Sequence, residues 1–160
     1  RLTSESVLEK LISNQVHPNT QSSAIINAKR KQVIEASDTA KQYAEMITAH
    51  LGWKQKIRSF INGADIGITQ ESAVDHTACA LGKWYYQGSG QHLMHLPMMK
   101  KLGDEHMEMH KLIGVIMDAF HVDDYETLDA SILKVDEQSD KVVAILNELI
   151  EYEGSQIQAI

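Results

Sequence analysis

The sequence predicts an all-α fold, namely a four-helix-bundle-like domain with one additional N-terminal helix. Only two prolines and nine glycines occur in 160 residues, which is fewer than the turns of a β-sandwich need. Apolar residues recur at steps of three and four along several stretches, which is the spacing of one helix face. A chain of this length buries one ordinary core and leaves no room for a second domain of standard size.

The first helix is predicted to begin after Thr3, because the Ser4 hydroxyl and the Glu5 carboxylate are typical of a helix start. It ends near Asn14, since Pro18 disfavours the helical conformation of the residue before it.

A second and much longer helix is predicted from Ser22 to Ile61, where Asn62 and Gly63 end it. Its apolar stripe includes one histidine, and Lys54 interrupts the stripe. The stripe consists of Val33, Ala36, Ala40, Tyr43, Ile47, His50, Ile57 and Ile61. Residues 63–71 form a predicted loop. A helix face that is otherwise apolar therefore places one imidazole in the interior.

A third helix is predicted from Ser72 to Tyr86, and the turn residues Gly88-Ser89-Gly90 close it. After a loop around Pro97, a fourth helix keeps the same rhythm over Met99, Leu102, His106, Met109, Ile113, Ile116 and Phe120. The last helix is predicted from Tyr125 to Glu153. Its heptad positions are Leu128, Ile132, Val135, Ser139, Val142, Leu146 and Leu149, of which one is polar.

Charge and composition exclude several classes of partner. The formal charge of −7 and the pI near 5.6 do not provide the basic surface that binding to nucleic acid or to an anionic membrane requires. The longest apolar stretches, such as residues 112–117, are far shorter than the ~20 residues of a spanning helix, so this segment is not expected to insert into a membrane. A single cysteine favours a reducing compartment such as the cytoplasm, with a periplasmic position as the alternative.

His106 and His110 are four residues apart, so their side chains share one face of a helix. His106 also lies on the apolar stripe of its helix, as His50 does on the stripe of another. Buried imidazoles need hydrogen-bond partners or a cation. Two interpretations follow: core histidines bonded to backbone carbonyls or to carboxylates such as Asp104 and Glu108, or ligands of a metal ion.

The single cysteine, Cys79, is either a small buried apolar residue or a fourth ligand. If it converges with the three histidines, the set consists of three nitrogens and one thiolate. Zinc is the first choice for this set, because it takes Cys and His in tetrahedral geometry, whereas calcium and magnesium prefer oxygen. Ferrous iron and copper bind the same atoms, so ligand type alone does not select the metal.

Three short motifs follow one another along the middle of the chain. They are His50-Leu51-Gly52-Trp53, then Cys79-Ala80-Leu81-Gly82-Lys83-Trp84-Tyr85-Tyr86, and finally His106 with His110. Together they resemble the chemoreceptor zinc-binding domain family of bacteria, whose pattern is a histidine followed by a tryptophan, a Cys-x-Leu-Gly-x-Trp core and a final His-x-x-x-His. The predicted zinc-binding bundle domain covers residues 36–155, and residues 1–35, an N-terminal helix and linker, lie outside the resemblance.

The resemblance implies that His50, Cys79, His106 and His110 hold zinc within a helical bundle. It also implies a sensory domain of a signal-transduction protein, commonly a homodimer, whose parent chain carries a chemotaxis signalling domain or a cyclic-di-GMP synthase as output. The signal would be zinc occupancy or oxidation of the zinc-bound Cys79. No enzymatic activity is expected of the domain itself.

Four further residues are candidates for contacts with the ligands. Trp53 and Trp84 are predicted to be walls that keep water away from the metal. His76 lies three residues before Cys79 on the same predicted helix, and three roles are open for it: a hydrogen-bond partner of a ligand, an alternative ligand, or a solvated surface residue. Asp75 is a candidate acceptor for the second ring proton of a ligand imidazole.

Two other functions are compatible with a helical chain rich in histidine. One is a structural dimerisation module without a metal, and the other is a hemerythrin-like di-iron bundle. A di-iron centre needs further histidines and bridging carboxylates, and the predicted stripes do not supply this second set.

Overall fold

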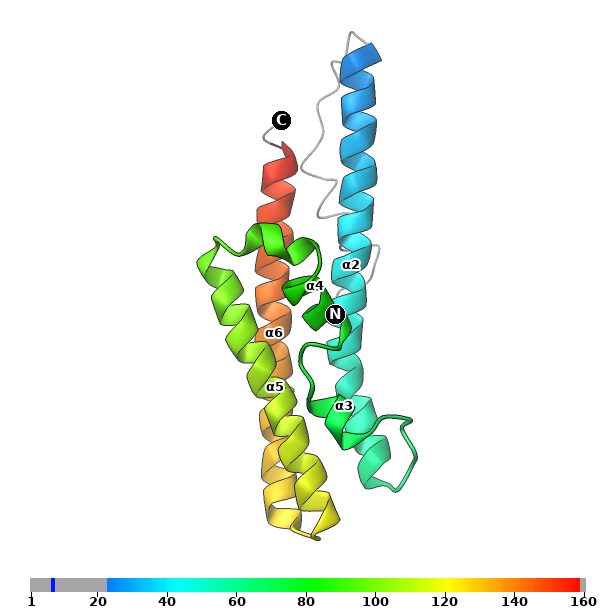
Figure 1. Ribbon diagram of the computed structural model, residues 1–160, viewed down its shortest axis with the longest axis vertical. Coiled ribbons are helices and arrows are strands. Elements are labelled where there is room, and N and C mark those ends of the chain that lie inside the picture. Colours follow the sequence, from blue (N-terminus) through cyan, green and yellow to red (C-terminus); the bar gives the residue numbers. More distant parts are fainter. Residues whose placement is uncertain (1–6, 8–22, 159–160) are drawn as a thin grey trace. The chain divides into compact units, whose positions relative to one another are not determined.

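The computed structural model describes residue 7 and residues 23–158. Within these ranges the chain forms five α-helices and one 3₁₀-helix and no strand, which confirms the all-α prediction. The helices are α2 (Ser23–Ile61), α3 (Gln70–Val74), α4 (Ala80–Tyr86), the 3₁₀-helix η2 (Ser89–Leu93), α5 (Pro97–His121) and α6 (Tyr125–Gln158) (Figure 1). The helix predicted near the N-terminus lies outside the described residues, except for Val7. None of the described helices has the length and apolar character needed to cross a lipid bilayer.

The chain divides into two compact units, and α2 and α6 contribute to both. In its described part, the first unit combines α2 up to Ile47 with α6 from Leu146 onward. The second unit is Thr48–Ile145, and it contains α3, α4, η2 and α5 together with the adjoining parts of α2 and α6. All of the predicted metal-binding residues lie in the second unit.

The first unit is held together by apolar faces of α2 and α6. The buried residues include Ala36, Ala40, Tyr43, Ala44, Met46 and Ile47 of α2 and Leu146, Leu149 and Ile150 of α6. Tyr43 lies near Glu153, and burial, followed by the charge of Glu153, raises the pKa of Tyr43. The predicted stripe of the second helix and the predicted heptad of the last helix include several of these buried residues, namely Ala36, Ala40, Tyr43, Ile47, Leu146 and Leu149.

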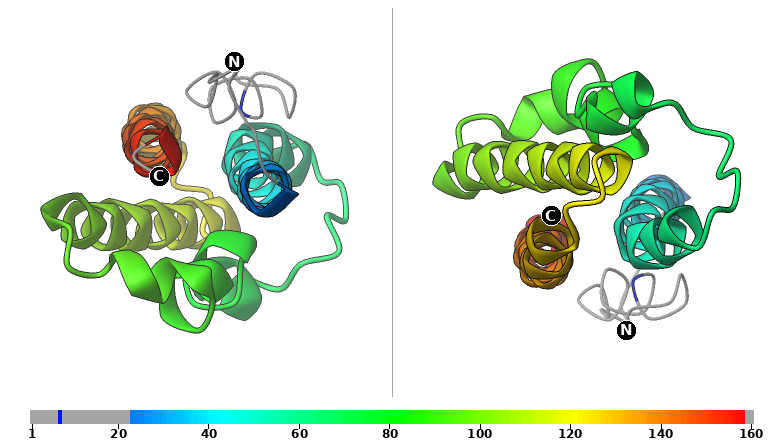
Figure 2. Two further views of the ribbon diagram at one scale, coloured as in Figure 1. Left: turned by 90° about the horizontal axis from the view of Figure 1, so that it is seen from above. Right: turned by 90° about the horizontal axis from the view of Figure 1, so that it is seen from below.

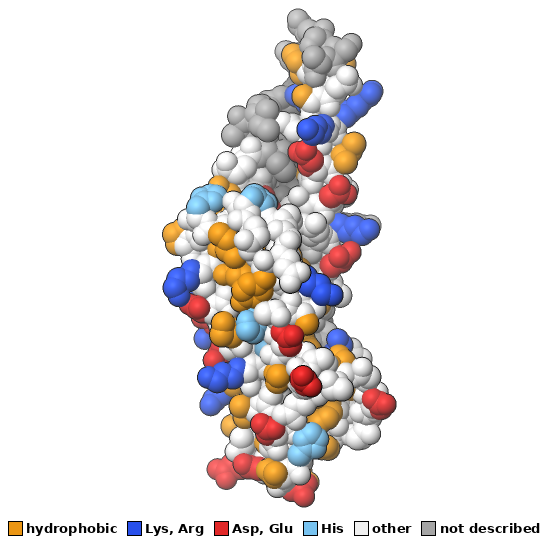
Figure 3. Space-filling model, viewed as in Figure 1, with side chains coloured by type: hydrophobic (Ala, Val, Ile, Leu, Met, Phe, Trp, Pro, Cys, Tyr) orange, Lys and Arg blue, Asp and Glu red, His pale blue; other side chains and the backbone are white. Residues whose placement is uncertain are grey.

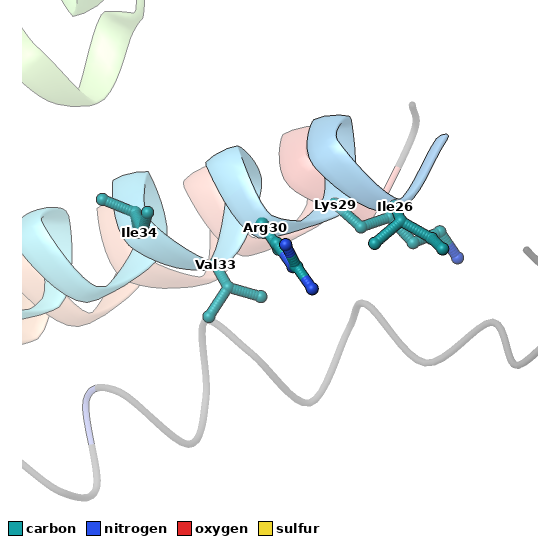
Figure 4. Close-up of a pocket in the computed structure, with 5 residues that line it drawn as sticks. All are labelled: Ile26, Lys29, Arg30, Val33 and Ile34. Carbon is teal, nitrogen blue, oxygen red and sulfur yellow. The ribbon is translucent and has the colours of Figure 1, made fainter. Parts of the chain in front are cut away.

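The prediction that Val33 lies in the core is wrong. Its side chain is 41% exposed, and it lies beside a hollow that is lined by Ile26, Lys29, Arg30, Val33 and Ile34 (Figure 4). Helix α6 passes Tyr43 at Glu153, and its described part ends little more than one turn later, at Gln158. No described helix therefore lies alongside Val33.

In the second unit, α3 lies against α5, and α4 lies against η2 (Figures 1 and 2). The predicted stripe of α5 is buried from Met99 to Ile116, and Phe120 is partly exposed. Gly114 lets α3 approach closely, because a Cβ atom there would lie 2.8 Å from Cγ1 of Val74. The turn between α5 and α6 exposes Asp123 and Asp124, and acidic side chains gather at this end of the unit (Figure 3).

The prediction of one helix from Ser72 to Tyr86 is wrong, because the chain turns between α3 and α4 over residues 75–79. Oδ1 of Asp75 accepts hydrogen bonds from the backbone N–H of Thr77 at 3.0 Å and from its hydroxyl at 2.5 Å. A short side chain that bonds to its own backbone in this way competes with the helix. Cys79 consequently lies at the start of α4 instead of inside a longer helix.

Candidate metal centre

The four predicted ligands come together in the second unit from three separate segments. His50 lies on α2, Cys79 at the start of α4, and His106 and His110 on α5. One ligand atom from each residue lies within 4.8 Å of the ligand atoms of the other three. The three histidines are 0–1% exposed, whereas Cys79 is half-buried.

The rings and the thiol are in mutual contact. The ring centroids of His50 and His106 are 4.9 Å apart, and those of His106 and His110 are 4.7 Å apart. The Sγ atom of Cys79 lies 3.2 Å from Nε2 of His106. These donors therefore face one small volume between α2, α4 and α5.

Cys79 is positioned by its role as the N-cap residue of α4. Its backbone is extended, and Sγ accepts a hydrogen bond from the backbone N–H of Gly82 at 3.4 Å. The absence of a side chain at Gly82 allows α4 to start close beneath the preceding turn. A Cβ atom there would lie 2.1 Å from the carbonyl oxygen of His76 and 2.7 Å from the carbonyl carbon of Thr77. The glycine of the Cys-x-Leu-Gly motif is thus required by packing.

Replacing Gly82 with alanine is expected to weaken both stability and zinc binding, because the new methyl group collides with backbone atoms at His76 and Thr77. Overpacking of this kind typically costs about 1–3 kcal/mol, which corresponds to a Tm lower by roughly 2–10 °C. Thermal unfolding and a zinc competition titration measure the two effects.

Gly52→Ala is the matched control for this substitution. Gly52 lies inside α2 and nothing lies within 4 Å of an added Cβ atom, so stability should stay the same or rise slightly. Equal behaviour of the two variants would contradict the proposed packing of α4.

His110 is oriented by a backbone group. Its Nδ1 atom lies 2.7 Å from the carbonyl oxygen of Ala73 in α3. A carbonyl oxygen accepts, so Nδ1 donates and Nε2 keeps the free lone pair. Nε2 of His110 is buried and has no hydrogen-bond partner among the described residues. A buried nitrogen of this kind, held by a hydrogen bond at the opposite ring position, is typical of a metal-binding histidine.

Burial sets the protonation of the site before any ion binds. Burial, and then the charges of neighbouring histidines, lowers the pKa of His106 to about 2. Burial likewise lowers the pKa of His110, against the opposing effect of the hydrogen bond to Ala73. Burial raises the pKa of the Cys79 thiol, although backbone N–H groups of α4 oppose this. The two imidazoles are therefore neutral donors at neutral pH, whereas the thiol must lose a proton before it binds a metal.

The donor set fits a tetrahedral ion. Tetrahedral zinc with bonds of about 2.0–2.3 Å separates its ligand atoms by about 3.3–3.6 Å. The Sγ to Nε2 distance of 3.2 Å is already close to this range, and the limit of 4.8 Å on the other pairs is little more than one ångström above it. Neutral imidazole nitrogens and a thiolate match zinc better than calcium or magnesium.

Of the other residues predicted to contact the ligands, the structure places Trp53, Trp84 and His76 in different surroundings. Trp53 is buried, and its ring centroid lies 6.1 Å from that of His110. Trp84 is buried against Gly90, where a Cβ atom would lie 2.9 Å from the indole ring. His76 is partly exposed on the turn before α4, and not on a helix shared with Cys79.

Nδ1 of His110 bonds to the backbone carbonyl of Ala73 and not to Asp75, whose carboxylate accepts hydrogen bonds from Thr77. Sequence reasoning also missed contacts from α6. Nε2 of Gln138 donates to the carbonyl oxygen of Glu105 at 2.9 Å, next to His106. The single polar position in the stripe of the last helix, Ser139, was the available signal for such a contact; its hydroxyl donates to the carbonyl oxygen of His50 at 3.5 Å.

An all-helical domain that brings three imidazoles and a thiol together in its interior belongs to the class of helical metal-binding domains. Residues 50–117 match the family model of the chemoreceptor zinc-binding domain. The match covers a little under half of the chain, begins at His50 and contains all four donors, while α6 lies outside it. No curated protein and no solved structure matches the chain.

Proposed function

We propose that this chain is a sensory domain in which His50, Cys79, His106 and His110 hold one zinc ion and report its state to an attached output. The observation that carries the proposal is the convergence of four suitable donor atoms within 4.8 Å in the second unit. Four protein ligands fill a tetrahedral ion and leave no open position for a substrate, as in structural rather than catalytic zinc sites. This supports a regulatory role rather than a hydrolytic one.

The bound ion would supply positive charge that holds the Cys79 thiol as a thiolate. Cys79 is the most exposed of the four donors, so a small oxidant reaches it first. A two-electron oxidant such as hypochlorous acid transfers its oxygen to the sulfur, which gives a sulfenic acid and releases chloride. The oxidised sulfur is a poorer donor, and zinc binding is then weakened.

A change at Cys79 has a direct route into the surrounding helices. Cys79 caps α4, and α4 is joined to α5 by the hydroxyl of Tyr85, which donates to the carbonyl oxygen of Met99 at 2.8 Å. Gly103 leaves room for this tyrosine, because a Cβ atom there would lie 2.4 Å from its hydroxyl oxygen. Loss of the ion or oxidation of the thiol would therefore displace α4 against α5.

The wider setting is also part of the proposal. The output would be a chemotaxis signalling domain or a cyclic-di-GMP synthase in the same parent chain, and the domain would act as a homodimer. A cytoplasmic position suits a thiolate that must be kept reduced until an oxidant arrives. Among the described residues, the four donors form the only group of three or more metal-binding side chains. The described residues therefore do not supply the second set of ligands that a di-iron centre needs.

Metal analysis of the purified chain is expected to give one zinc per chain, and one equivalent of hypochlorite is expected to release it. Mass spectrometry should place the added oxygen on Cys79, and a chromogenic chelator should follow the zinc. Zinc that stays bound with unchanged affinity after Cys79 is oxidised would contradict the redox part of the proposal. Absence of zinc from protein purified without chelators would contradict the whole.

A further inference from the structure

The buried state of the donors raises the question of how an ion enters and leaves. His50, His106 and His110 are 0–1% exposed, so the half-buried Cys79 is the most accessible of the four donors. A tetrahedral zinc ion can accept a fifth ligand for a short time. Exchange at a closed site is therefore faster when an additional donor is available at its edge.

His76 occupies this edge. It lies on the turn between α3 and α4, three residues before Cys79, and it is partly exposed. Its ring centroid is 6.2 Å from that of His106 and 5.6 Å from that of Tyr86. Its charge also contributes to lowering the pKa of both His106 and His110. Among the described histidines outside the cluster, it is the one with a ring contact to a cluster member.

A surface groove leads to His76. The groove lies between α3 and α5, has a volume of about 500 Å³, and is lined by His76, Met107, Lys111 and Gly114 among others. None of the four donors of the metal centre lines it. His76 thus lines a surface groove and also lies beside the ring of His106.

The neighbouring residue Asp75 adds negative charge at the same edge. It is fully exposed, and hydrogen bonds from Thr77 lower the pKa of its carboxyl group. The carboxylate is close enough to act electrostatically on His76, His110 and Cys79. An ionised carboxylate next to a partly exposed imidazole attracts a divalent cation toward the entrance.

Building on the proposed function, we propose that His76 is a fifth zinc-binding side chain, which passes the ion between solvent and the four buried donors. On entry, a ring nitrogen of His76 would replace a water molecule of the hydrated ion. The thiol of Cys79 then gives its proton to solvent, and its sulfur takes the place of His76. Release follows the reverse order, and no electrons are transferred in either direction.

The test compares the full chain with its His76→Gln variant, which keeps a side chain of similar size but lacks the imidazole. Stopped-flow mixing of zinc chloride with the metal-free protein gives the loading rate, and mixing of the zinc protein with a chromogenic chelator gives the release rate. Both rates are expected to fall about tenfold, which corresponds to a barrier higher by about 1.4 kcal/mol in each direction. The dissociation constant from equilibrium competition is expected to change less than about threefold, because loading and release slow together.

His95→Gln is the matched control, because His95 is an exposed histidine of the same unit and does not belong to the donor cluster. It should leave both rates unchanged. Wild-type rates in the His76 variant would overturn the inference, and so would a dissociation constant about 100-fold weaker, since His76 would then be a permanent ligand. A wild-type chain that binds no zinc would instead overturn the proposed function, so the two failures are distinguishable.

Discussion

The Cys79→Ala variant is expected to bind zinc at least about 100-fold more weakly than the wild-type chain. Loss of a contact outside the ligand set commonly costs 10–100-fold in affinity, and Cys79 supplies a donor atom itself. Its Sγ atom is 3.2 Å from Nε2 of His106, and no other thiol exists in the chain to replace it. Competition against a chelator of known affinity measures the effect. Stoichiometric zinc at unchanged affinity would exclude Cys79 as a ligand.

Cys79→Ser separates the two roles of this residue. Serine is a good N-cap, so the start of α4 should persist, whereas the hydroxyl is a poor zinc ligand. The serine variant without metal should therefore be more stable than the alanine variant by about 1 kcal/mol, although both bind zinc weakly. Equal stability of the two variants would show that the cap contributes little.

Proton release gives a second measurement on the same variants. Burial raises the pKa of the Cys79 thiol, so the metal-free site holds this proton at neutral pH. Zinc binding should then release about one proton, and affinity should rise with pH until the thiol ionises without the metal. Because burial lowers the pKa of His106 and His110, these two imidazoles compete with protons only in more acidic solution. Cys79→Ala should lose the proton release.

Removal of zinc is expected to lower the stability of the chain by several kcal/mol. Binding of a ligand at 1,000 times its dissociation constant stabilises the folded state by about 4 kcal/mol, which corresponds to roughly 10 °C in Tm for a chain of this size. Without the ion, the buried Nε2 atom of His110 has no partner among the described residues. Thermal unfolding before chelation, after chelation and after addition of zinc measures the change.

Hydrogen exchange shows where this stability resides. Chelation should increase exchange mainly in α3, α4 and the turn over residues 75–79, because these segments are short and lie against the donors. The described part of the first unit should change least, since none of the four donors lies in it. Uniform loss of protection, or a Tm that does not depend on zinc, would contradict this expectation.

The long helices were predictable because their apolar periodicity extends over many turns. The predicted start at Tyr125 agrees with the structure, and the predicted end at Ile61 does too. The interior positions of His50 and His106 followed from the same periodicity, and both are buried. A pattern repeated over many residues outweighs the preference of any single one.

The short elements were not predictable from periodicity. The break between α3 and α4 depends on one carboxylate, Asp75, which bonds to Thr77 instead of leaving the helix to continue. The exposure of Val33 depends on where the neighbouring helix ends, which the sequence of α2 does not contain. Local side-chain hydrogen bonds and tertiary neighbours decide these features, and neither leaves a periodic pattern in the sequence.

The hydrogen bond from His110 to the carbonyl oxygen of Ala73 affects which residues related chains can carry at position 73. Every residue type carries that oxygen, so the contact imposes no amino-acid identity at position 73. It imposes a size, because the side chain of Ala73 is completely buried against its surroundings. In a mutational scan, glycine or serine at position 73 should preserve zinc binding, and bulky residues should abolish it. The pattern of tolerated residues would then resemble that of an ordinary core position, although the backbone there orients a zinc ligand.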